Sequence, residues 1–391
     1  MGGGLMQLVA YGAQDIYLTG NPQITFFKVV YRRHTNFAIE AIEQTWNGDS
    51  GTTSGGRCTA TISRNGDLVN RMYLEIVGTT KSGENNASAT AITNIELEIG
   101  GQKIDKQSGL WMEVWAELTE PNSSCHVGSV TAADTIGGTL FQNMSGMGGV
   151  GNNGRTDAMR YWVPLQFWFC RNPGLALPLI ALQYHEVKVI LDHKLGTGGN
   201  LTGVTNNLWC DYIYLDTDER RRFAQVSHEY LIEQVQEQSL STPTGSSDIN
   251  FNRPVKELVW VDTTGFDTDG ALVVAASASA TYQLKLNGHD RFAARDFRYF
   301  TRTQIWQHHT GPGGVDSDHT SAASGRALDT ICVYSFALKP EEHQPSGTCN
   351  FSRIDNAQLV GSANCIADTV FAVNYNVLRI MSGMGGLAYS N

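Results

Sequence analysis

The sequence has little charge, and the charge that it has is mostly negative. Only 17% of its 391 residues are Asp, Glu, Lys or Arg, and the formal net charge is −10 at pH 7. Proteins that bind nucleic acid through its phosphates are normally basic, so an electrostatic nucleic-acid binder is excluded. Long apolar runs are missing too, because the most apolar stretch, LALPLIAL at 175–182, is far shorter than the roughly 20 residues of a membrane-spanning helix.

Several functional motifs are also absent. The sequence contains no Gly-Lys dipeptide and no G-x-S-x-G, which excludes a P-loop and the usual nucleophile elbow. The seven cysteines never form a C-x-x-C pair, so we predict reduced, mostly buried thiols and no zinc site. His308, His309 and His319 share a polar loop, but loop histidines are more often solvated than metal-bound. We therefore predict no catalytic residue, no metal ligand and no cofactor.

Short segments rich in β-branched and aromatic residues are what the sequence does contain. Their composition and partial alternation predict β-strands at 73–78, 95–101, 161–169, 186–191, 211–216 and 256–262. Turn-forming Asn-Gly and Gly-Gly pairs separate several of these segments. Helical spacing is scarce, and SGLWMEVWAELTE (108–120) is the one segment that predicts a helix. The pattern indicates an all-β sandwich such as a jelly roll.

The two halves of the chain are similar at three places, which occur in the same order. The matched pairs are FAIEAIEQT (37–45) with YLIEQVQEQ (230–238), LEIGGQKID (97–105) with LKLNGHDRF (284–292), and FWFCRNPGLALPL (167–179) with YSFALKPEEHQPS (334–346). Ordered self-similarity of this kind indicates a tandem duplication. We therefore predict two domains, at 28–217 and 218–391, with the charged segment 218–228 as the linker between them.

Loops rich in Gly, Ser, Thr and Asn lie between the predicted strands, and the longest spans residues 121–157. Long loops in compact domains are usually functional or exposed, so we expect this loop on the surface. The sequence contains five N-x-S/T sequons, and the one at Asn350 lies in a segment that we expect to be structural. Because the N-terminus shows no secretory signal, ordinary glycosylation is not expected. The remaining four sequons fall in predicted loops and are the glycosylation candidates: Asn86, Asn122, Asn143 and Asn200.

Two basic clusters precede the first matched segment of each half. They comprise Lys28, Arg32 and Arg33 in the first half and Arg220, Arg221 and Arg222 in the second. Since each cluster precedes the same predicted strand, we expect both to emerge at similar ends of the two domains. The clusters are either solvated charge at the entrance of a strand or a docking surface for an acidic partner or lipid headgroups.

Segments along the whole chain closely resemble major capsid proteins of nucleocytoplasmic large DNA viruses, in particular those of the chlorovirus and phycodnavirus branch. The segments include GLMQLVAYGAQDIYLTGNPQITFFKVVYRRHTNFAIE (4–40), NPGLALPLIALQYHEVKV (172–189), DYIYLDTDERRRFAQVSHEYLIEQ (211–234), SFALKPEEHQPSGTCNFSRIDNA (335–357) and NYNVLRIMSGMGGLAY (374–389). The resemblance is highly specific and lapses only in the loops.

This resemblance implies a double jelly roll, two tandem eight-stranded sandwiches with an extended N-terminal arm at 1–27. It implies a structural protein of the virion whose homotrimers form pseudo-hexagonal capsomers of an icosahedral shell. Minor capsid proteins and the internal viral membrane would be partners at the base of the capsomer, near the arm and the two basic clusters. The resemblance further implies outer loops that viral enzymes glycosylate, assembly in the host cytoplasm, and no direct contact with nucleic acid.

Two other functions stay open at this point. A carbohydrate-binding or carbohydrate-hydrolysing β-sandwich would need an aromatic platform, to which Trp260 or Trp306 would contribute, although Trp is more often a core or interface residue. A minor paralogous capsid protein is the other alternative, because the loops at 263–281 and 307–327 are short for the family. A vertex protein usually has a single jelly roll, which the duplication disfavours. An obligate trimer would favour the capsid protein, and a stable monomer that binds glycans would favour the carbohydrate-binding protein.

Overall fold

Strands dominate the computed structural model, which describes residues 3–51, 55–80, 87–120, 140–148, 158–196, 201–262, 279–311 and 329–389. The chain divides into two units, residues 1–36 and residues 37–391. The first unit holds two short helices without a buried residue, α1 (Gly3–Val9) and α2 (Ile16–Thr19). None of the helices in the described residues combines the length and the apolar character that a bilayer crossing requires.

Residues 37–215 form two antiparallel sheets. One sheet has the strand order β1-β10-β4-β7, with β8 also paired to β4, and the other has the order β2-β3-β9-β5-β6. The first sheet consists of β1 (Phe37–Gln44), β10 (Leu201–Leu215), β4 (Leu68–Thr80), β7 (Ala158–Pro164) and β8 (Leu177–Pro178). The second sheet consists of β2 (Trp46–Gly48), β3 (Gly56–Thr61), β9 (Val187–His193), β5 (Ile92–Ile99) and β6 (Gln102–Ser108).

Residues 228–387 form two further antiparallel sheets. Their strand orders are β11-β19-β13-β16, with β17 on β13 and β20 on β19, and β12-β18-β14-β15. The first of them consists of β11 (His228–Ser239), β19 (Thr369–Met381), β13 (Pro254–Val261), β16 (Cys332–Ser335), β17 (Cys349–Asn350) and β20 (Met384–Leu387). The other consists of β12 (Gly245–Asp248), β18 (Ala357–Gly361), β14 (Thr281–Leu286) and β15 (His289–Asp296).

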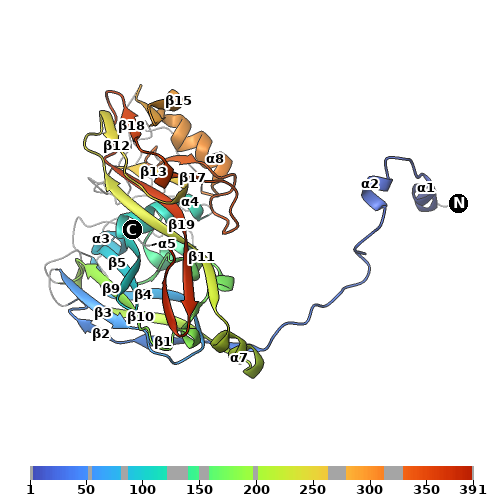
Figure 1. Ribbon diagram of the computed structural model, residues 1–391, viewed down its shortest axis with the longest axis horizontal. Helices are drawn as coiled ribbons and strands as arrows, with labels where there is room; N and C mark the ends of the chain where they lie inside the picture. The colour runs from blue at the N-terminus through green and yellow to red at the C-terminus, as the bar shows by residue number, and fades with distance from the viewer. Residues whose placement is uncertain are drawn as a thin grey trace. The chain divides into compact units, whose positions relative to one another are not determined.

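The two halves share one strand order. If the principal strands of each half are numbered one to eight along the chain, leaving aside β2, β8, β17 and β20, both halves have sheets ordered 1-8-3-6 and 2-7-4-5. This is the order of a jelly roll. The prediction of an all-β double jelly roll of two eight-stranded sandwiches is therefore confirmed (Figure 1). The domain limits at 27/28 and 217/218 stay predictions, and the separate N-terminal unit extends to Asn36.

The segments that suggested a duplication lie at equivalent places. The first pair forms β1 and β11, which are the first strands of the two jelly rolls. The second pair forms the β5-β6 and β14-β15 hairpins, whose turns contain the positive-φ pairs Gly100–Gly101 and Asn287–Gly288. The third pair begins just after β7 in the first jelly roll and at the end of β16 in the second. The strand predicted at 161–169 is wrong beyond Pro164, because a short helix, α6 (Trp168–Arg171), buries Trp168 and Phe169 instead.

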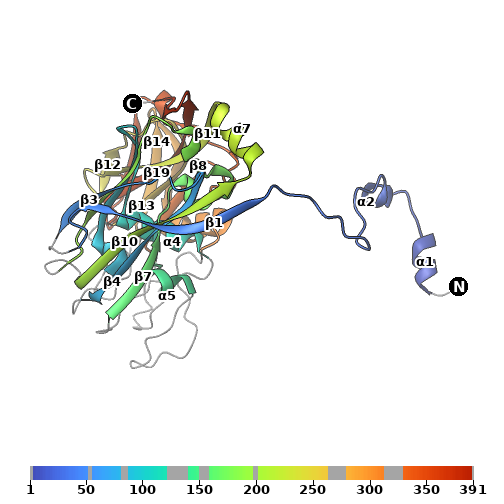
Figure 2. The ribbon, with the colours of Figure 1, turned by 90° about the horizontal axis from the view of Figure 1, so that it is seen from below.

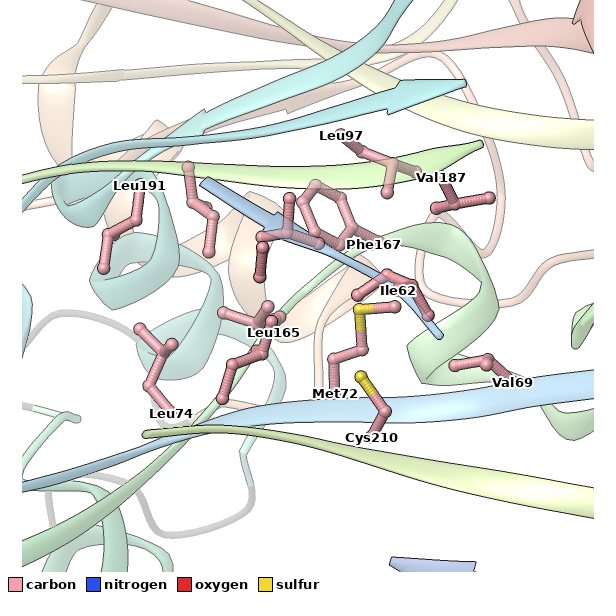
Figure 3. Close-up of a cluster of buried hydrophobic side chains, with 14 of the residues drawn as sticks. Ile62, Val69, Met72, Leu74, Leu97, Leu165, Phe167, Val187, Leu191 and Cys210 are labelled. Atoms are coloured by element: carbon pink, nitrogen blue, oxygen red, sulfur yellow. The ribbon is translucent and has the colours of Figure 1, made fainter. Parts of the chain in front are cut away.

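The core of the first jelly roll lies between its two sheets. Met72 and Leu74 of β4 and Cys210 of β10 face Leu97 of β5 and Val187 of β9 (Figure 3). Every second residue of each strand points inward, as the pleat of a strand requires. The second jelly roll has its own core, rich in aromatic rings, in which Trp260 contacts Tyr282 and Phe300. Each jelly roll therefore has its own apolar interior.

Helices connect the strands. The predicted helix is confirmed as α4 (Gly109–Thr119), whose N-terminus is capped by the Ser108 hydroxyl accepting a hydrogen bond from the Trp111 amide at 3.2 Å. The predicted linker forms helix α7 (Thr217–Gln225). The other helical segments are α3 (Ala87–Ala91), α5 (Leu140–Ser145), η1 (Pro173–Leu175), η2 (Leu179–Ala181), a π-helical turn η3 (Tyr299–Thr303), α8 (Gln304–His308) and η4 (Phe351–Arg353).

The segment 140–148 is not the exposed loop that its composition suggested. Ser145 and Met147 are buried, and the Gly148 amide donates to both carboxylate oxygens of Glu113 at 3.0 Å. A Cβ on Gly146 would lie 2.7 Å from the Tyr161 ring. This part of the predicted 121–157 loop is therefore packed against α4 and β7, and the rest of the loop lies outside the described residues.

The C-terminal hairpin of the second jelly roll is packed on the first. The Gly383 carbonyl accepts from the Tyr184 amide at 2.9 Å, and the Gly385 carbonyl lies 2.9 Å from Nδ1 of His185. A Cβ on Gly385 would lie 2.6 Å from Leu182, so glycine permits this close approach. The repeated hexapeptide MSGMGG, at 144–149 and 381–386, thus supplies glycines for close contacts at two unrelated places.

Candidate assembly surfaces

The first jelly roll contacts the second through helix α4. Its apolar side chains pack on the outer face of the sheet β11-β19-β13-β16, where the cluster contains Trp111, Val114, Trp115, Leu118, Val259, Val261, Val333, Phe371 and Val373. In Figure 1, α4 lies between the strands of the first half and those of the second half. One strand also takes part, because β6 of the first jelly roll contacts β11 of the second. The contact therefore joins a helix-and-strand surface of one jelly roll to a sheet face of the other.

Hydrogen bonds fix the β6-β11 contact. The Val235 amide donates to Oδ1 of Asp105 at 3.2 Å, and the Gln234 side chain donates to the Ile104 carbonyl. Burial raises the pKa of the Asp105 carboxyl to about 6, although the Gln107 side chain, the Val235 amide and Arg171 favour its charged form. The strand edge of the first jelly roll thus presents a fixed acceptor to the second.

Buried ion pairs connect the same two surfaces. Glu233 on β11 pairs with Arg171 of α6 at 2.9 Å and with Lys256 of β13 at 2.9 Å. The Arg171 guanidinium lies 4.8 Å from the centre of the Trp115 ring. The Lys256 side chain is fully buried, and this burial lowers the pKa of its ammonium group, which Glu233 and Glu257 oppose. A buried charge of this kind requires partners, so Arg171, Glu233 and Lys256 depend on one another.

His309 holds the neighbouring segment of the second jelly roll in place. Its Nε2 lies 2.9 Å from Glu257, its Nδ1 lies 3.0 Å from Glu341, and its side chain is fully buried. Burial opposes charge on the ring, but the two carboxylates outweigh this effect and raise the pKa of His309 to about 9. Both ring nitrogens are occupied and the ring has no access to solvent. The cluster therefore holds this segment of the second jelly roll in place.

The strands β1, β10, β4 and β7 of the first jelly roll lie side by side in one sheet (Figure 2). Because Met72 and Leu74 face the core, Tyr73 between them lies on the outer face of this sheet. A hollow of about 620 Å³ borders both this face and the contact between the jelly rolls. Its lining includes Arg71, Tyr73, Trp162 and Asp211 of the sheet, Trp115, Thr119 and Glu120 at the end of α4, Arg171 of α6 and Glu341 of the second jelly roll. Trp162 is 39% exposed. Burial raises the pKa of Asp211, an effect that Arg71 opposes. The lining therefore combines aromatic surface with charges of both signs.

Two large apolar side chains are exposed on and beside helix α8 of the second jelly roll, Trp306 and Leu338. Ile305 packs inward, whereas Trp306 is 80% exposed. Leu338 is 74% exposed, and its carbonyl lies 3.1 Å from Nδ1 of His308. Two large exposed apolar side chains on adjacent segments are typical of an interaction surface. Trp260, the other predicted aromatic platform, is buried at 1% exposure, so the expectation of a sugar platform at that residue is wrong.

The predicted docking residues lie in different units. Lys28, Arg32 and Arg33 belong to the unit of residues 1–36, and all three are exposed. Arg220, Arg221 and Arg222 are exposed on α7, where Arg220 pairs with the buried Asp67 at 3.0 Å. The two clusters are therefore not brought together by any described contact, and their common partner stays a prediction.

The predicted modification and metal sites are only partly described. Asn86, Asn122 and Asn200 lie outside the described residues, as does His319, and Asn143 lies on α5 with its side chain outside the description. Within the described part of the chain, no group of three or more His, Cys, Asp and Glu side chains could hold a metal ion. The six cysteines in that part are free thiols, which confirms the prediction for them.

The sequence did not reveal the buried ion pairs. Lys256 and Glu257 lie in KELVWVD, which the sequence predicted as a strand without indicating which of its faces are buried. Both faces of β13 are buried instead, one in the core and one beneath α4. The only signal was the pair of adjacent charges next to an apolar run, which is equally common at the ends of exposed strands.

Comparisons with known proteins agree over the whole chain. Residues 25–216 match the family model described as "Major capsid protein N-terminus", and residues 219–386 match the one described as "Large eukaryotic DNA virus major capsid protein". The major capsid proteins of Pyramimonas orientalis virus and Paramecium bursaria Chlorella virus 1 are 51% and 42% identical, each over 100% of both chains.

Solved structures are similar as well. PBCV-1 VP54, in the crystal structure that was fitted into a cryo-EM reconstruction of the virophage Sputnik, matches with a TM-score of 0.75 at 36% identity, over 94% of this chain and 100% of that chain. The Faustovirus major capsid protein is only 13% identical but shares the fold, with a TM-score of 0.65 over 95% of this chain and 94% of that chain. The chain therefore belongs to the family of major capsid proteins of large eukaryotic DNA viruses and is a structural component of the icosahedral capsid.

Proposed function

We propose that the working unit of this capsid protein is a homotrimer that forms a pseudo-hexagonal capsomer. The observation that carries the proposal is the presence of two jelly rolls with the same strand order in one chain. Three such chains around a three-fold axis present six similar sandwiches, which suits hexagonal packing of capsomers in a shell. Such a trimer would bury the outer face of the sheet β1-β10-β4-β7 and the exposed side chains of Trp306 and Leu338.

The arm at 1–27 is an assembly strap in this proposal. Its apolar side chains, including Leu8, Tyr17, Phe26 and Phe27, are largely exposed, and an exposed apolar segment gains free energy when it orders against a partner. The basic residues Lys28, Arg32 and Arg33 and those of α7 would dock on minor capsid proteins or on anionic headgroups of the viral membrane at the base. Assembly would take place in the host cytoplasm.

The protein acts in this proposal without catalysis and without a cofactor, and viral enzymes attach glycans to its outer loops at Asn86, Asn122, Asn143 or Asn200. The buried location of the Glu257–His309–Glu341 cluster supports a purely structural role for its titratable groups. Intact-mass measurement of the protein from virions, compared with protein made in bacteria, would show any attached sugar. Unchanged mass and unmodified asparagine peptides would refute the glycan assignment.

Light scattering on the purified full chain tests the trimer. Three chains of 42.7 kDa give about 128 kDa, and we expect this mass at micromolar concentration. Because broad apolar contact is insensitive to salt, the mass should persist from 0.1 to about 1 M NaCl. A monomer of 42.7 kDa under all of these conditions would contradict the proposal.

A further inference from the structure

The loop between β3 and β4 contains an Asn-Gly pair, Asn65–Gly66. Asparagine is a thermolabile residue, because its side-chain amide can be attacked by the backbone nitrogen of the next residue. A following glycine favours this attack, since it has no side chain in the way and a flexible backbone. The pair lies outside the helices and strands, and Asn65 is exposed. The loop therefore carries a reactive dipeptide at the surface.

The residues on either side of this pair are held by hydrogen bonds. On one side, the Arg64 guanidinium donates to the Leu182 carbonyl at 2.6 Å. On the other side, the Asp67 amide donates to a carbonyl of β10 at 3.1 Å. Among the residues that the structure describes, neither the Asn65 side chain nor the Gly66 amide forms a hydrogen bond. Both the attacking nitrogen and the group that it would attack are therefore unrestrained, in a loop that is otherwise fixed.

Two other Asn-Gly pairs in the described residues are restrained. Oδ1 of Asn287 accepts from the amides of Asp355 and Asn356 at 2.9 and 3.0 Å, which holds its side chain in place. The pair at 47–48 lies in β2, and its main chain is paired with β3. A further pair, at 153–154, lies outside the described residues. The structure thus separates one unrestrained pair from two restrained pairs of the same sequence.

We propose that Asn65 is a site of spontaneous deamidation, and that its conversion to isoaspartate loosens the linker helix α7. The Gly66 nitrogen forms a bond to Cγ of Asn65, and the side-chain nitrogen leaves as ammonia, which takes the proton that the Gly66 amide loses. Water then opens the resulting succinimide ring at one of its two carbonyls and leaves either aspartate or isoaspartate. In isoaspartate the main chain runs through the former side chain and is longer by one carbon atom.

The longer main chain does not fit between the fixed ends of the loop. A Cβ on Gly66 would lie 2.8 Å from Cβ of Tyr212, so the loop already passes close to that side chain. The next residue, Asp67, accepts from the Leu215 amide at 2.9 Å and pairs with Arg220 at 3.0 Å. Arg220 lies on α7, which connects the two jelly rolls. An inserted carbon atom therefore displaces Asp67 and weakens its hold on α7.

Incubation of the purified full chain at pH 8 and 37 °C, followed by peptide mass spectrometry over time, tests the site. We expect Asn65 to convert about tenfold faster than Asn287 or more, because Asn287 must first lose two hydrogen bonds. Unfolding the chain in guanidinium chloride removes these restraints and should bring the two rates close together. An unmodified Asn65, or equal rates for Asn65 and Asn287 in the folded chain, would overturn the proposal.

The effect on α7 is tested with Asn65→Gln, which keeps the exposed amide but would have to form a larger ring and so reacts slowly. Labelling with a protein isoaspartyl methyltransferase identifies isoaspartate at position 65 in the aged native chain. We expect backbone hydrogen exchange at 217–225 to be faster in the aged native chain than in the fresh one. Aged Asn65→Gln should exchange like the fresh protein. Aged native chains that contain isoaspartate at position 65 but exchange at the original rate would overturn the effect on the linker.

Discussion

Charged residues inside β13 show what the sequence can predict about single residues. The composition of KELVWVD, which is rich in β-branched and aromatic residues, correctly indicated a strand of a sandwich. It could not indicate that Lys256 and Glu257 are fully buried, because the cover comes from α4, which lies more than 130 residues earlier in the chain. Burial of a charge is a property of the tertiary contact and has no local signature.

Substitution of His309 tests how much one buried charged residue contributes to stability. Replacing it by Gln should lower the free energy of unfolding by about 3 kcal/mol at pH 7, because Glu257 then lacks its positive partner. His309 has a folded pKa of about 9, above the ordinary 6.5, so its stabilising effect is complete below pH 6.5 and is lost as the pH rises through 9. Urea unfolding at pH 6.5, 8 and 10 and at one protein concentration measures the difference between the two proteins.

The control for this substitution is His343→Gln, because His343 is partly exposed and burial lowers its pKa. We expect a change below about 1 kcal/mol for the control. A gap between the native protein and His309→Gln that stays constant up to pH 10 would show that the ring is not held as a cation.

Among the elements, strands and the main helix were predicted well and the connecting segments less well. The six predicted strands all occur, and α4 was recognised from apolar residues at helical spacing after Ser108. The extension of β7 beyond Pro164 was wrong, since Phe167, Trp168 and Phe169 are apolar because they fill the core from a short helix and not because they alternate in a sheet. An apolar run indicates burial without indicating which element is buried.

Substitution of Ser108 tests how much the N-cap of helix α4 contributes to stability. Ser108→Ala removes the acceptor for the Trp111 amide and should destabilise the protein by about 1 kcal/mol. Ser108→Thr keeps the hydroxyl and should recover most of this loss. Because α4 forms the contact between the jelly rolls, the melting temperature should fall in the Ala variant. Equal melting temperatures for Ala and Thr would show that the cap contributes nothing.

For the whole molecule, the duplication was visible in the sequence but the surfaces it creates were not. Three matched segments predicted a tandem duplication, and in the structure these segments occupy equivalent places of the two jelly rolls. The docking of one jelly roll on the other depends on Arg171, Glu233 and the outer face of β13. Arg171 and Glu233 are more than 60 residues apart in the sequence. No pattern within a single segment encodes that contact, so the assembly surfaces could be found only from the fold.

Arg171 tests whether the two jelly rolls unfold as one body. Arg171→Met keeps an apolar stem beside Trp115 but removes the partner of Glu233 across the contact. Calorimetry should show a single transition for the native chain and either two transitions or a melting temperature lower by several degrees for the variant, since removing one partner of a buried pair costs about 3–5 kcal/mol. An exposed-pair control, Arg379→Met, removes a contact with Glu229 and should have little effect. Identical scans for the Arg171 variant and the native chain would refute the coupling.

The C-terminal hairpin determines when the first jelly roll is complete. Ile232, Leu378 and Ile380 belong to the core cluster of that jelly roll, and Gly383 and Gly385 lie against Tyr184 and Leu182. During synthesis at about 5–20 residues per second, these last strands leave the ribosome on the order of 10–35 s after β10. The half of the protein that is made first therefore lacks part of its apolar packing until the last strands of the second half have been made.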